Sequence, residues 1–273
     1  MQTPKSILLH LDSSARTAKR IAVARQLAET FDAQVTGVPC TMPALMQYPF
    51  AMEAGGDVIA VMTQLDADRR NAMHAQFVAA SAGSAAMHWT EPMKDAPWGI
   101  AQRALYADLL VLGQRDPDDP QGAELPADFV PGLLVDSGRP ALVLPYAGPV
   151  APIGRKVMLA WKPSPESARA VAAALPWLRS AKVVHAVGFG DGADAALQSL
   201  REYLARQGVS VELHAAGAEQ GDAGDLLLSR AADLDADLLV MGCYGHSRSR
   251  EWLLGGATRT VLQSMTLPVL MSH

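Results

Sequence analysis

The chain has 273 residues, of which 49% are hydrophobic and 19% charged, and its formal net charge is -5. This length is typical of two domains of ordinary size, and the apolar content suffices for two cores. The acidic balance and the lack of a Lys/Arg stripe argue against a nucleic-acid-binding surface. We therefore expect a small molecule or another protein as the partner.

The two cysteines, Cys40 and Cys243, belong to no CxxC or Cys/His metal spacing. This pattern is typical of a reduced intracellular protein. The apolar run at 6–11 is interrupted by His10 and is too short for a signal peptide or a membrane span, so we interpret it as the first strand. The sequence thus predicts a cytoplasmic protein without membrane contact.

In the first half, buried apolar runs alternate with segments of helical periodicity. Ser13 or Ser14 is the expected N-cap of the first helix. A segment rich in Pro and Met follows the second strand, and its residues 41–62 are a candidate cover for a pocket of this half. Strands are predicted at 6–11, 34–38, 88–89, 108–112 and 141–144, and helices after the first strand and at 57–80, 98–106 and 128–137.

The Pro/Gly-rich segment 145–154 is the predicted linker, which places one domain at 1–146 and the other at 154–273. The second half repeats the order of the first, and ADLLVLG (107–113) is almost identical to ADLLVMG (236–242). This repetition predicts a duplicated α/β unit with ligands at the carboxyl ends of parallel strands. The strands of this half are predicted at 156–161, 181–187, 209–213, 238–241 and 268–271.

The strongest functional signal lies in residues 236–258. A buried strand ends at Gly242, Gly245 follows, and nine residues later the pair Gly255 and Gly256 precedes a helix. Glycine lets a backbone approach an anion, and the free N–H groups of such a loop and of the first helical turn point toward it. The spacing is neither GxxxxGK[ST] nor GxGxxG, but it predicts phosphate binding.

The spacing Gly242-x2-Gly245-x9-Gly255 resembles the ATP-binding loop of the universal stress protein family, in which a Ser or Thr follows the third glycine. Here Gly256 takes that position, and Thr258 lies one turn inside the helix. The resemblance implies two tandem flavodoxin-like, adenine nucleotide alpha hydrolase-like domains, each a five-stranded parallel sheet with helices on both faces. It also implies that the halves form an intrachain pseudo-dimer through the edge strands at 141–144 and 268–271.

The resemblance implies that the second half binds ATP or a related adenine nucleotide, with Mg²⁺ as a further ligand. Lys162 stands where the family has an acidic residue; a lysine can pair with phosphate but cannot accept hydrogen bonds from a ribose. Trp161 and Val187 are candidates to flank a base. The implied binding residues are Ala160, Trp161, Lys162, Val187, Met241, Gly242, Gly245, His246, Ser247, Gly255, Gly256, Ala257 and Thr258.

The first half keeps Asp12 where the family places an acidic residue near the base and ribose. However, Asp116 replaces the second glycine of the loop, and Ala127 and Asp128 replace the glycine pair. A carboxylate at that place repels phosphate, so we predict that this half is a degenerate partner without a phosphate loop.

Two other patterns suggest different chemistry. Residues 188–193, GFGDGA, follow a strand and have Glu212 nineteen residues later, which matches a dinucleotide fingerprint, although Asp191 would face the pyrophosphate. Four histidines fall in or beside strands without ligand-type spacing, so we interpret them as core or edge residues and predict no metal site. They are His10, His88, His185 and His214.

We therefore predict a stress-response, nucleotide-binding regulator that acts on an unidentified protein partner and forms a homodimer. Since no catalytic motif is evident, we expect at most weak ATP hydrolysis. Two alternatives stay open: a scaffold that binds no nucleotide and acts through dimerisation, and a dinucleotide-binding oxidoreductase.

Overall fold

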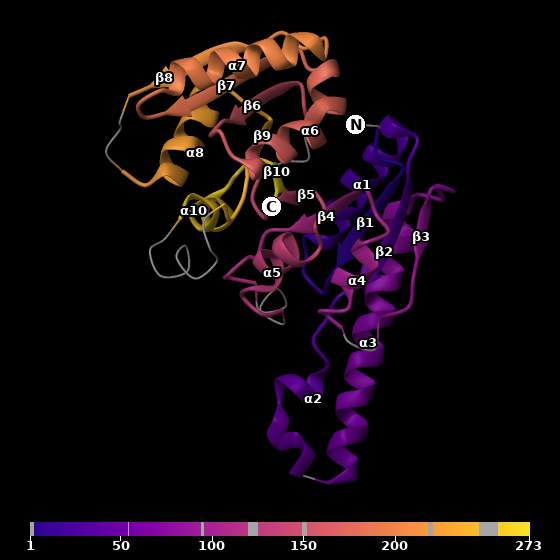
Figure 1. The fold of residues 1–273 in the computed structure, drawn as a ribbon. Coiled ribbons are helices and arrows are strands. Elements are labelled where there is room, and N and C mark those ends of the chain that lie inside the picture. Colours follow the sequence, from indigo (N-terminus) through magenta and orange to yellow (C-terminus); the bar gives the residue numbers. More distant parts are fainter. Residues whose placement is uncertain are drawn as a thin grey trace. The chain divides into compact units, whose positions relative to one another are not determined.

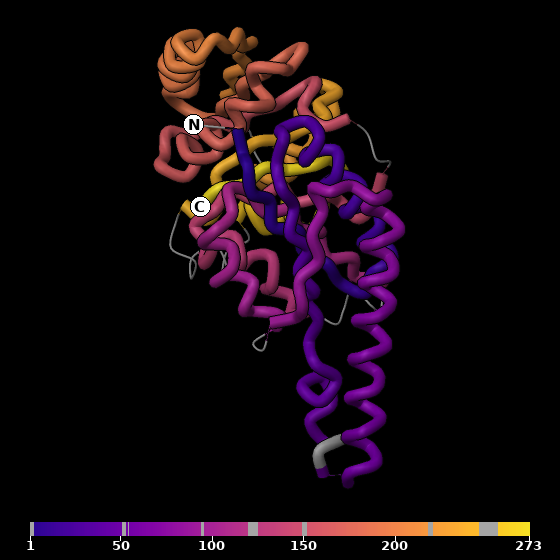
Figure 2. Tube along the Cα trace, turned by 90° about the vertical axis from the view of Figure 1, so that its right-hand side faces the viewer, coloured from indigo at the N-terminus to yellow at the C-terminus, as the bar shows by residue number. Residues whose placement is uncertain are grey.

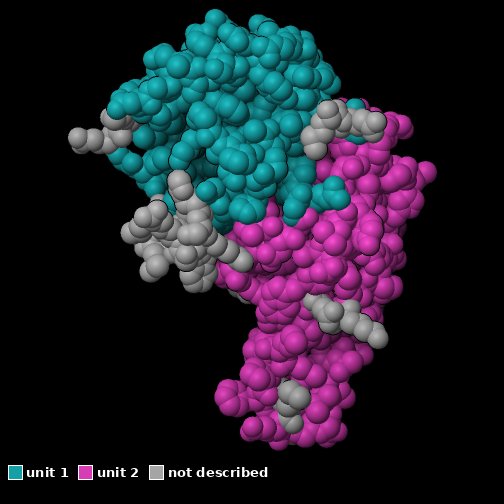
Figure 3. Space-filling view, in the orientation of Figure 1, with its two compact units in different colours: residues 1–3, 138–273 teal, residues 4–137 magenta. Residues whose placement is uncertain are grey.

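The computed structural model describes residues 3–53, 55–93, 96–119, 125–148, 152–217, 221–245 and 256–273. The chain divides into two compact units, residues 4–137 and residues 138–273, and the latter unit also includes residues 1–3 (Figure 3). Each unit combines buried, mostly parallel strands with helices, which confirms the predicted α/β fold (Figure 1). No helix of the described residues has both the length and the apolar character needed to cross a bilayer.

The first unit has four parallel strands in the order β3-β2-β1-β4. The neighbouring strands β1 and β4 are almost wholly buried, as parallel strands between covered faces usually are. In chain order its elements are β1 (Ser6–Leu11), α1 (Thr17–Phe31), β2 (Gln34–Pro39), α2 (Ala44–Gln47), the 3₁₀ helix η1 (Pro49–Glu53), α3 (Gly56–Ser81), β3 (Met87–Trp89), α4 (Ile100–Ala104), β4 (Leu109–Gly113) and α5 (Phe129–Asp136).

The second unit has the strand order β5-β10-β9-β6-β7-β8, in which β8-β7-β6-β9 repeats the order of the first unit. The strands near 141–144 and 268–271 pair as predicted, antiparallel with Val143 opposite Val269, but both belong to this unit, whereas the prediction placed them in different halves. The elements are β5 (Ala141–Leu144), β6 (Lys156–Ala160), α6 (Pro165–Ser180), β7 (Val183–Phe189), α7 (Ala193–Arg206), β8 (Glu212–Ala216), α8 (Ala223–Asp233), β9 (Leu238–Gly242), α10 (Ala257–Ser264) and β10 (Val269–Ser272).

The aspartate of the repeated ADLLV words has a structural role in each unit. The Asp108 carboxylate accepts hydrogen bonds from the N–H groups of Lys5 and Ser6, both at 2.9 Å. The Asp237 carboxylate accepts hydrogen bonds from three consecutive N–H groups, those of residues 154–156, at 2.7, 3.1 and 3.2 Å. The carboxylate thereby fixes the start of the first strand beside the start of the fourth.

Two local predictions are wrong. The strand expected at 209–213 starts at Glu212, because Val209 instead packs against the end of α7, where its N–H donates to the Leu204 carbonyl at 2.9 Å. No serine caps α1; its N-cap residue is Arg16, and the Ser14 hydroxyl donates to Asp12 at 2.6 Å.

Residues 44–81 form a helical arm that extends from the sheet of the first unit, with α2 beside α3 (Figure 2). Only the last turns of α3 are buried, where Phe77 packs on Gly37 of β2. The side chains of Met46 and Phe50 are 62% and 82% exposed. The Met-rich region therefore forms an arm with exposed apolar side chains and not a cover over the ends of the strands.

Candidate functional site

The carboxyl ends of β6 and β9 lie side by side in the second unit, with Ala160 opposite Met241 in parallel register. Trp161 follows β6, and its N–H donates to the carbonyl of Val187 on β7 at 2.8 Å. The exposed Lys162 comes next. The structure thus brings these predicted residues together at one edge of the sheet.

Trp161 and Val187 differ in what they offer a ligand. The Val187 side chain is 1% exposed, so only its main chain is available. The indole ring of Trp161 is half-buried, and its N–H is buried with no hydrogen-bond acceptor among the described residues. An unsatisfied buried donor costs about 1–3 kcal/mol, which a ligand acceptor would recover.

Gly242 ends β9 under the first turn of α6. A Cβ atom at Gly242 would lie 2.5 Å from the backbone nitrogen of Ser167, so only glycine permits this approach. Gly245 is exposed, and a Cβ there would lie 3.0 Å from a carboxylate oxygen of Glu166. The two glycines therefore bring the loop close to the start of α6.

The start of α10 is like that of α7, whose N-cap Gly192 also gives no side-chain cap, and differs from the starts of α6 and α8. Ser164 caps α6 and Asp222 caps α8 through side-chain oxygens. The N-cap residue of α10 is Gly256, which has no side chain to give, and no other side chain of the described residues caps the first N–H groups of this helix, from Ala257 on. Those groups and the helix dipole favour an anion at this end.

Thr258 is 3% exposed, and its hydroxyl accepts a long hydrogen bond, 3.4 Å, from the N–H of Tyr244. The threonine therefore ties the start of the loop to the start of α10. His246, Ser247 and Gly255, which the sequence also places in the site, lie outside the described residues.

Glu166 is a residue of this site that the sequence analysis missed. Its carboxylate is 14% exposed and pairs with Arg169 at 3.1 Å. A hydrogen bond from its own main-chain N–H lowers the pKa of Glu166 below its usual value. An acidic residue in the first turn of a helix is common for reasons of the helix dipole alone, so the sequence offered no specific signal.

The C-terminal residue braces the same loop. The imidazole Nδ1 of His273 donates to the Cys243 carbonyl at 3.1 Å, and its own carbonyl accepts from Arg169 at 2.7 Å. Cys243 itself is 1% exposed.

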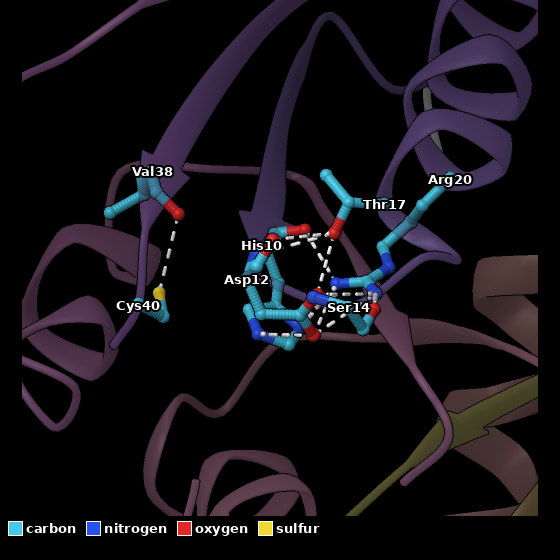
Figure 4. A network of polar contacts seen from close by, with 7 residues as sticks. All are labelled: His10, Asp12, Ser14, Thr17, Arg20, Val38 and Cys40. Carbon is cyan, nitrogen blue, oxygen red and sulfur yellow. Dashed lines mark hydrogen bonds and ion pairs between the residues drawn. The ribbon is translucent and has the colours of Figure 1, made fainter. Parts of the chain in front are cut away.

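The equivalent end of β1 in the first unit is occupied by a buried ion pair (Figure 4). Arg20 donates from both terminal nitrogens to Asp12 at 3.1 Å, and both side chains are buried. Burial alone would raise the pKa of Asp12, but the Arg20 guanidinium and the hydroxyls of Ser14 and Thr17 hold it well below its usual range. The family resemblance implied that Asp12 contacts a ligand. In the structure its carboxylate is instead bound by side chains of the same unit.

His10 completes this network. Arg20 donates to its Nδ1 at 2.9 Å, which leaves the ring proton on Nε2. Burial, assisted by the Arg20 charge, lowers the pKa of His10 from 6.5 to about 3, so the ring is neutral. The guanidinium also lies against Gly113 at the end of β4, where a Cβ would be 2.6 Å from it. Side chains of the first unit therefore fill the place that a ligand would take.

The other histidines and the dinucleotide pattern need a different interpretation. His185, Glu212 and His214 lie together on β7 and β8, which spacing along one element could not indicate. Burial and the neighbouring His185 lower the pKa of His214. Glu212 starts β8 opposite His185, which lies four residues before the end of β7 at Phe189, inside GFGDGA. The Gly190 N–H already donates to the Ala216 carbonyl at 3.0 Å. This arrangement disfavours a dinucleotide site.

Comparison with known proteins gives a family for the second half. Residues 154–273 match the model of the universal stress protein family. The chain is similar over 99% of its length to a universal stress protein from Archaeoglobus fulgidus DSM 4304, with TM-score 0.73, 17% identity and 96% of that chain covered. It is similar over the same share to a functionally unknown protein from Pseudomonas aeruginosa PAO1, with TM-score 0.63, 20% identity and 93% coverage.

A comparison with curated proteins by sequence gave no match. At such identities, the likeness to the solved structures concerns the fold, and the family rests on the matched segment. The chain thus carries a universal stress protein domain at residues 154–273, within a tandem fold that it shares along its whole length with a solved universal stress protein.

Proposed function

We propose that the second unit binds an adenine nucleotide, ATP or a close relative, and that the protein is thereby a stress-response regulator. The observation that carries the proposal is the start of α10 at Gly256. No side chain of the described residues caps it, as at Gly192 before α7, and it alone of these two helices follows the glycine loop of a universal stress protein domain.

In this proposal the phosphates lie on the N–H groups of the loop and of the first turn of α10. Lys162, at the end of β6, supplies a positive charge for them, and the indole N–H of Trp161 donates to an acceptor on the base or ribose. The Glu166 carboxylate beside Gly245 repels bare phosphate but suits a Mg²⁺ ion shared with it.

We propose little or no hydrolysis. Phosphoryl transfer needs a group that positions the attacking water. Glu166, the carboxylate that the described residues bring beside Gly245, is held by Arg169. Binding would then regulate by ordering the loop for a protein partner, with a homodimer as the assembly.

A second candidate is a scaffold that acts by association alone. The exposed apolar side chains of the helical arm favour it, among them Phe50 and Val61, which are 82% and 63% exposed. Deleting the arm and measuring the molar mass in solution distinguishes this role, since a loss of association without a change in nucleotide affinity would support it.

The deciding experiment for nucleotide binding is thermal unfolding and calorimetry with ATP, AMP, NAD or no ligand. We expect ATP at about 100 times its Kd to stabilise the protein by about 2.7 kcal/mol. Gly245→Asp should abolish the response, because the new carboxylate faces both the phosphates and Glu166. Gly217→Asp is the matched control, since Gly217 is exposed and a Cβ there meets no atom of the described residues within 4 Å. No response of the natural sequence, or an equal response of Gly245→Asp, would overturn the proposal.

A further inference from the structure

Three side chains of metal-ligand type meet on the edge strand of the second sheet. Glu212 and His214 are two residues apart on β8, and they therefore project from the same face. His185 stands opposite Glu212 on the neighbouring strand β7. The parallel register thus gathers two imidazoles and one carboxylate at one place.

The distances suit a single small ion. The Nδ1 of His185 lies 3.1 Å from the Nε2 of His214 and 3.2 Å from a carboxylate oxygen of Glu212. One ligand atom from each of the three residues falls within 4.8 Å of the others. Ligands bound tetrahedrally to Zn²⁺ at about 2.0–2.1 Å are themselves about 3.3 Å apart.

The cluster has one buried ligand residue and one that is exposed to solvent. His185 is 8% exposed, whereas the Glu212 side chain is 66% exposed. The cation nearby, Arg230, has a carboxylate of its own, Asp233, at 3.9 Å. An ion can therefore enter from solvent, and three protein ligands leave a coordination position for water or a small anion.

We propose that His185, Glu212 and His214 bind a divalent transition-metal ion of the Zn²⁺ class. Two imidazoles with one carboxylate suit Zn²⁺, Co²⁺ or Ni²⁺, whereas Mg²⁺ and Ca²⁺ prefer oxygen ligands. The ion would join β8 to β7 and so hold the edge of the sheet, independently of the nucleotide loop.

The test uses the full-length, untagged protein, freed of metal by a chelator. Calorimetry with Zn²⁺ and visible absorption with Co²⁺ should both give one ion per chain, with the Co²⁺ bands of a four- or five-coordinate site. Mg²⁺ should give no heat of binding at this site.

Two variants remove ligands, and one serves as control. His214→Asn and Glu212→Gln should each weaken Zn²⁺ binding by at least about tenfold and remove the Co²⁺ bands. Glu212→Gln changes an exposed side chain, so it keeps the test informative if His214→Asn fails to fold. His88→Asn, on the edge strand of the first unit, should bind like the natural sequence. No ion bound by the natural sequence, or equal binding by all three variants, would mean that the cluster is only a hydrogen-bonded histidine pair.

Discussion

A ligand is expected at the carboxyl ends of β1 and β6, which take equivalent places in the strand orders of the two units. The charged side chains at these two strand ends differ. After β1, Asp12 and Arg20 neutralise each other in a buried network. The positions 150 residues later hold Lys162 and Ala170, so neither the carboxylate nor the guanidinium is present. In the same strand order, a few side chains therefore decide whether the end of the strand is filled by an internal ion pair or leaves main-chain donors for a ligand.

The largest expected effect on stability comes from removing Arg20 from the buried ion pair after β1. Arg20→Ala leaves Asp12 buried without its counter-ion, and we expect the first unit to lose about 3–5 kcal/mol of stability. The measurement is urea unfolding. Arg16→Ala, at the exposed N-cap residue of the same helix, whose side chain makes no capping hydrogen bond, is the control and should stay within about 0.5 kcal/mol of the natural sequence. Equal stability of the two variants would contradict the proposed closure.

A slightly smaller effect is expected at the second end. In Gly242→Ala the new methyl meets the backbone of α6, which cannot move aside as a flexible side chain can. We expect a loss of about 1–3 kcal/mol in the second unit. Gly217→Ala meets nothing within 4 Å and should leave the unfolding midpoint unchanged. A stable Gly242→Ala protein would show that α6 is not held against β9 as described.

Acid should destabilise the first unit through His10 in the buried network after β1. Because the pKa of His10 falls from 6.5 to about 3 on folding, the unfolded chain binds more protons below pH 6.5 and stability declines as the pH falls toward 3. Between pH 7.5 and 5 this histidine alone removes about 2 kcal/mol. His10→Gln should flatten that slope in denaturant unfolding. An unchanged slope in the variant would assign the acid sensitivity to other groups.

The smallest expected effect is a change in ATP affinity, caused by Glu166 in the candidate site after β6. Glu166→Gln removes a negative charge beside Gly245, and in the absence of Mg²⁺ we expect ATP to bind about fivefold more tightly, about 1 kcal/mol. If Glu166 shares Mg²⁺ with the phosphates, the gain should disappear when Mg²⁺ is added. Glu202→Gln, on the exposed face of α7, is the matched control. A weaker affinity without Mg²⁺ would rule out the repulsion.

Much of the fold was predictable because buried parallel strands have unbroken apolar sequences, such as LLVLG and LLVMG. The site was less so. Arg20 lies on a helix, where an arginine usually faces solvent, so its burial against Asp12 and Gly113 depends on tertiary contacts that no local pattern records. His185 and His214 come from different strands, and only the register brings them together. The glycine loop was recognisable because its signal is the residue type and spacing themselves, which the sequence records directly. The domain boundaries at 1–146 and 154–273 stay a prediction.

The antiparallel pairing of β5 with β10 has a consequence for how this protein can be divided. A fragment cut at the linker, residues 154–273, would lack β5 and would expose the backbone N–H and C=O groups of β10 along a bare sheet edge. Such an edge recruits strands from other molecules. Fragments of that kind should therefore self-associate through β10, whereas a fragment that begins at residue 138 keeps β10 paired with β5.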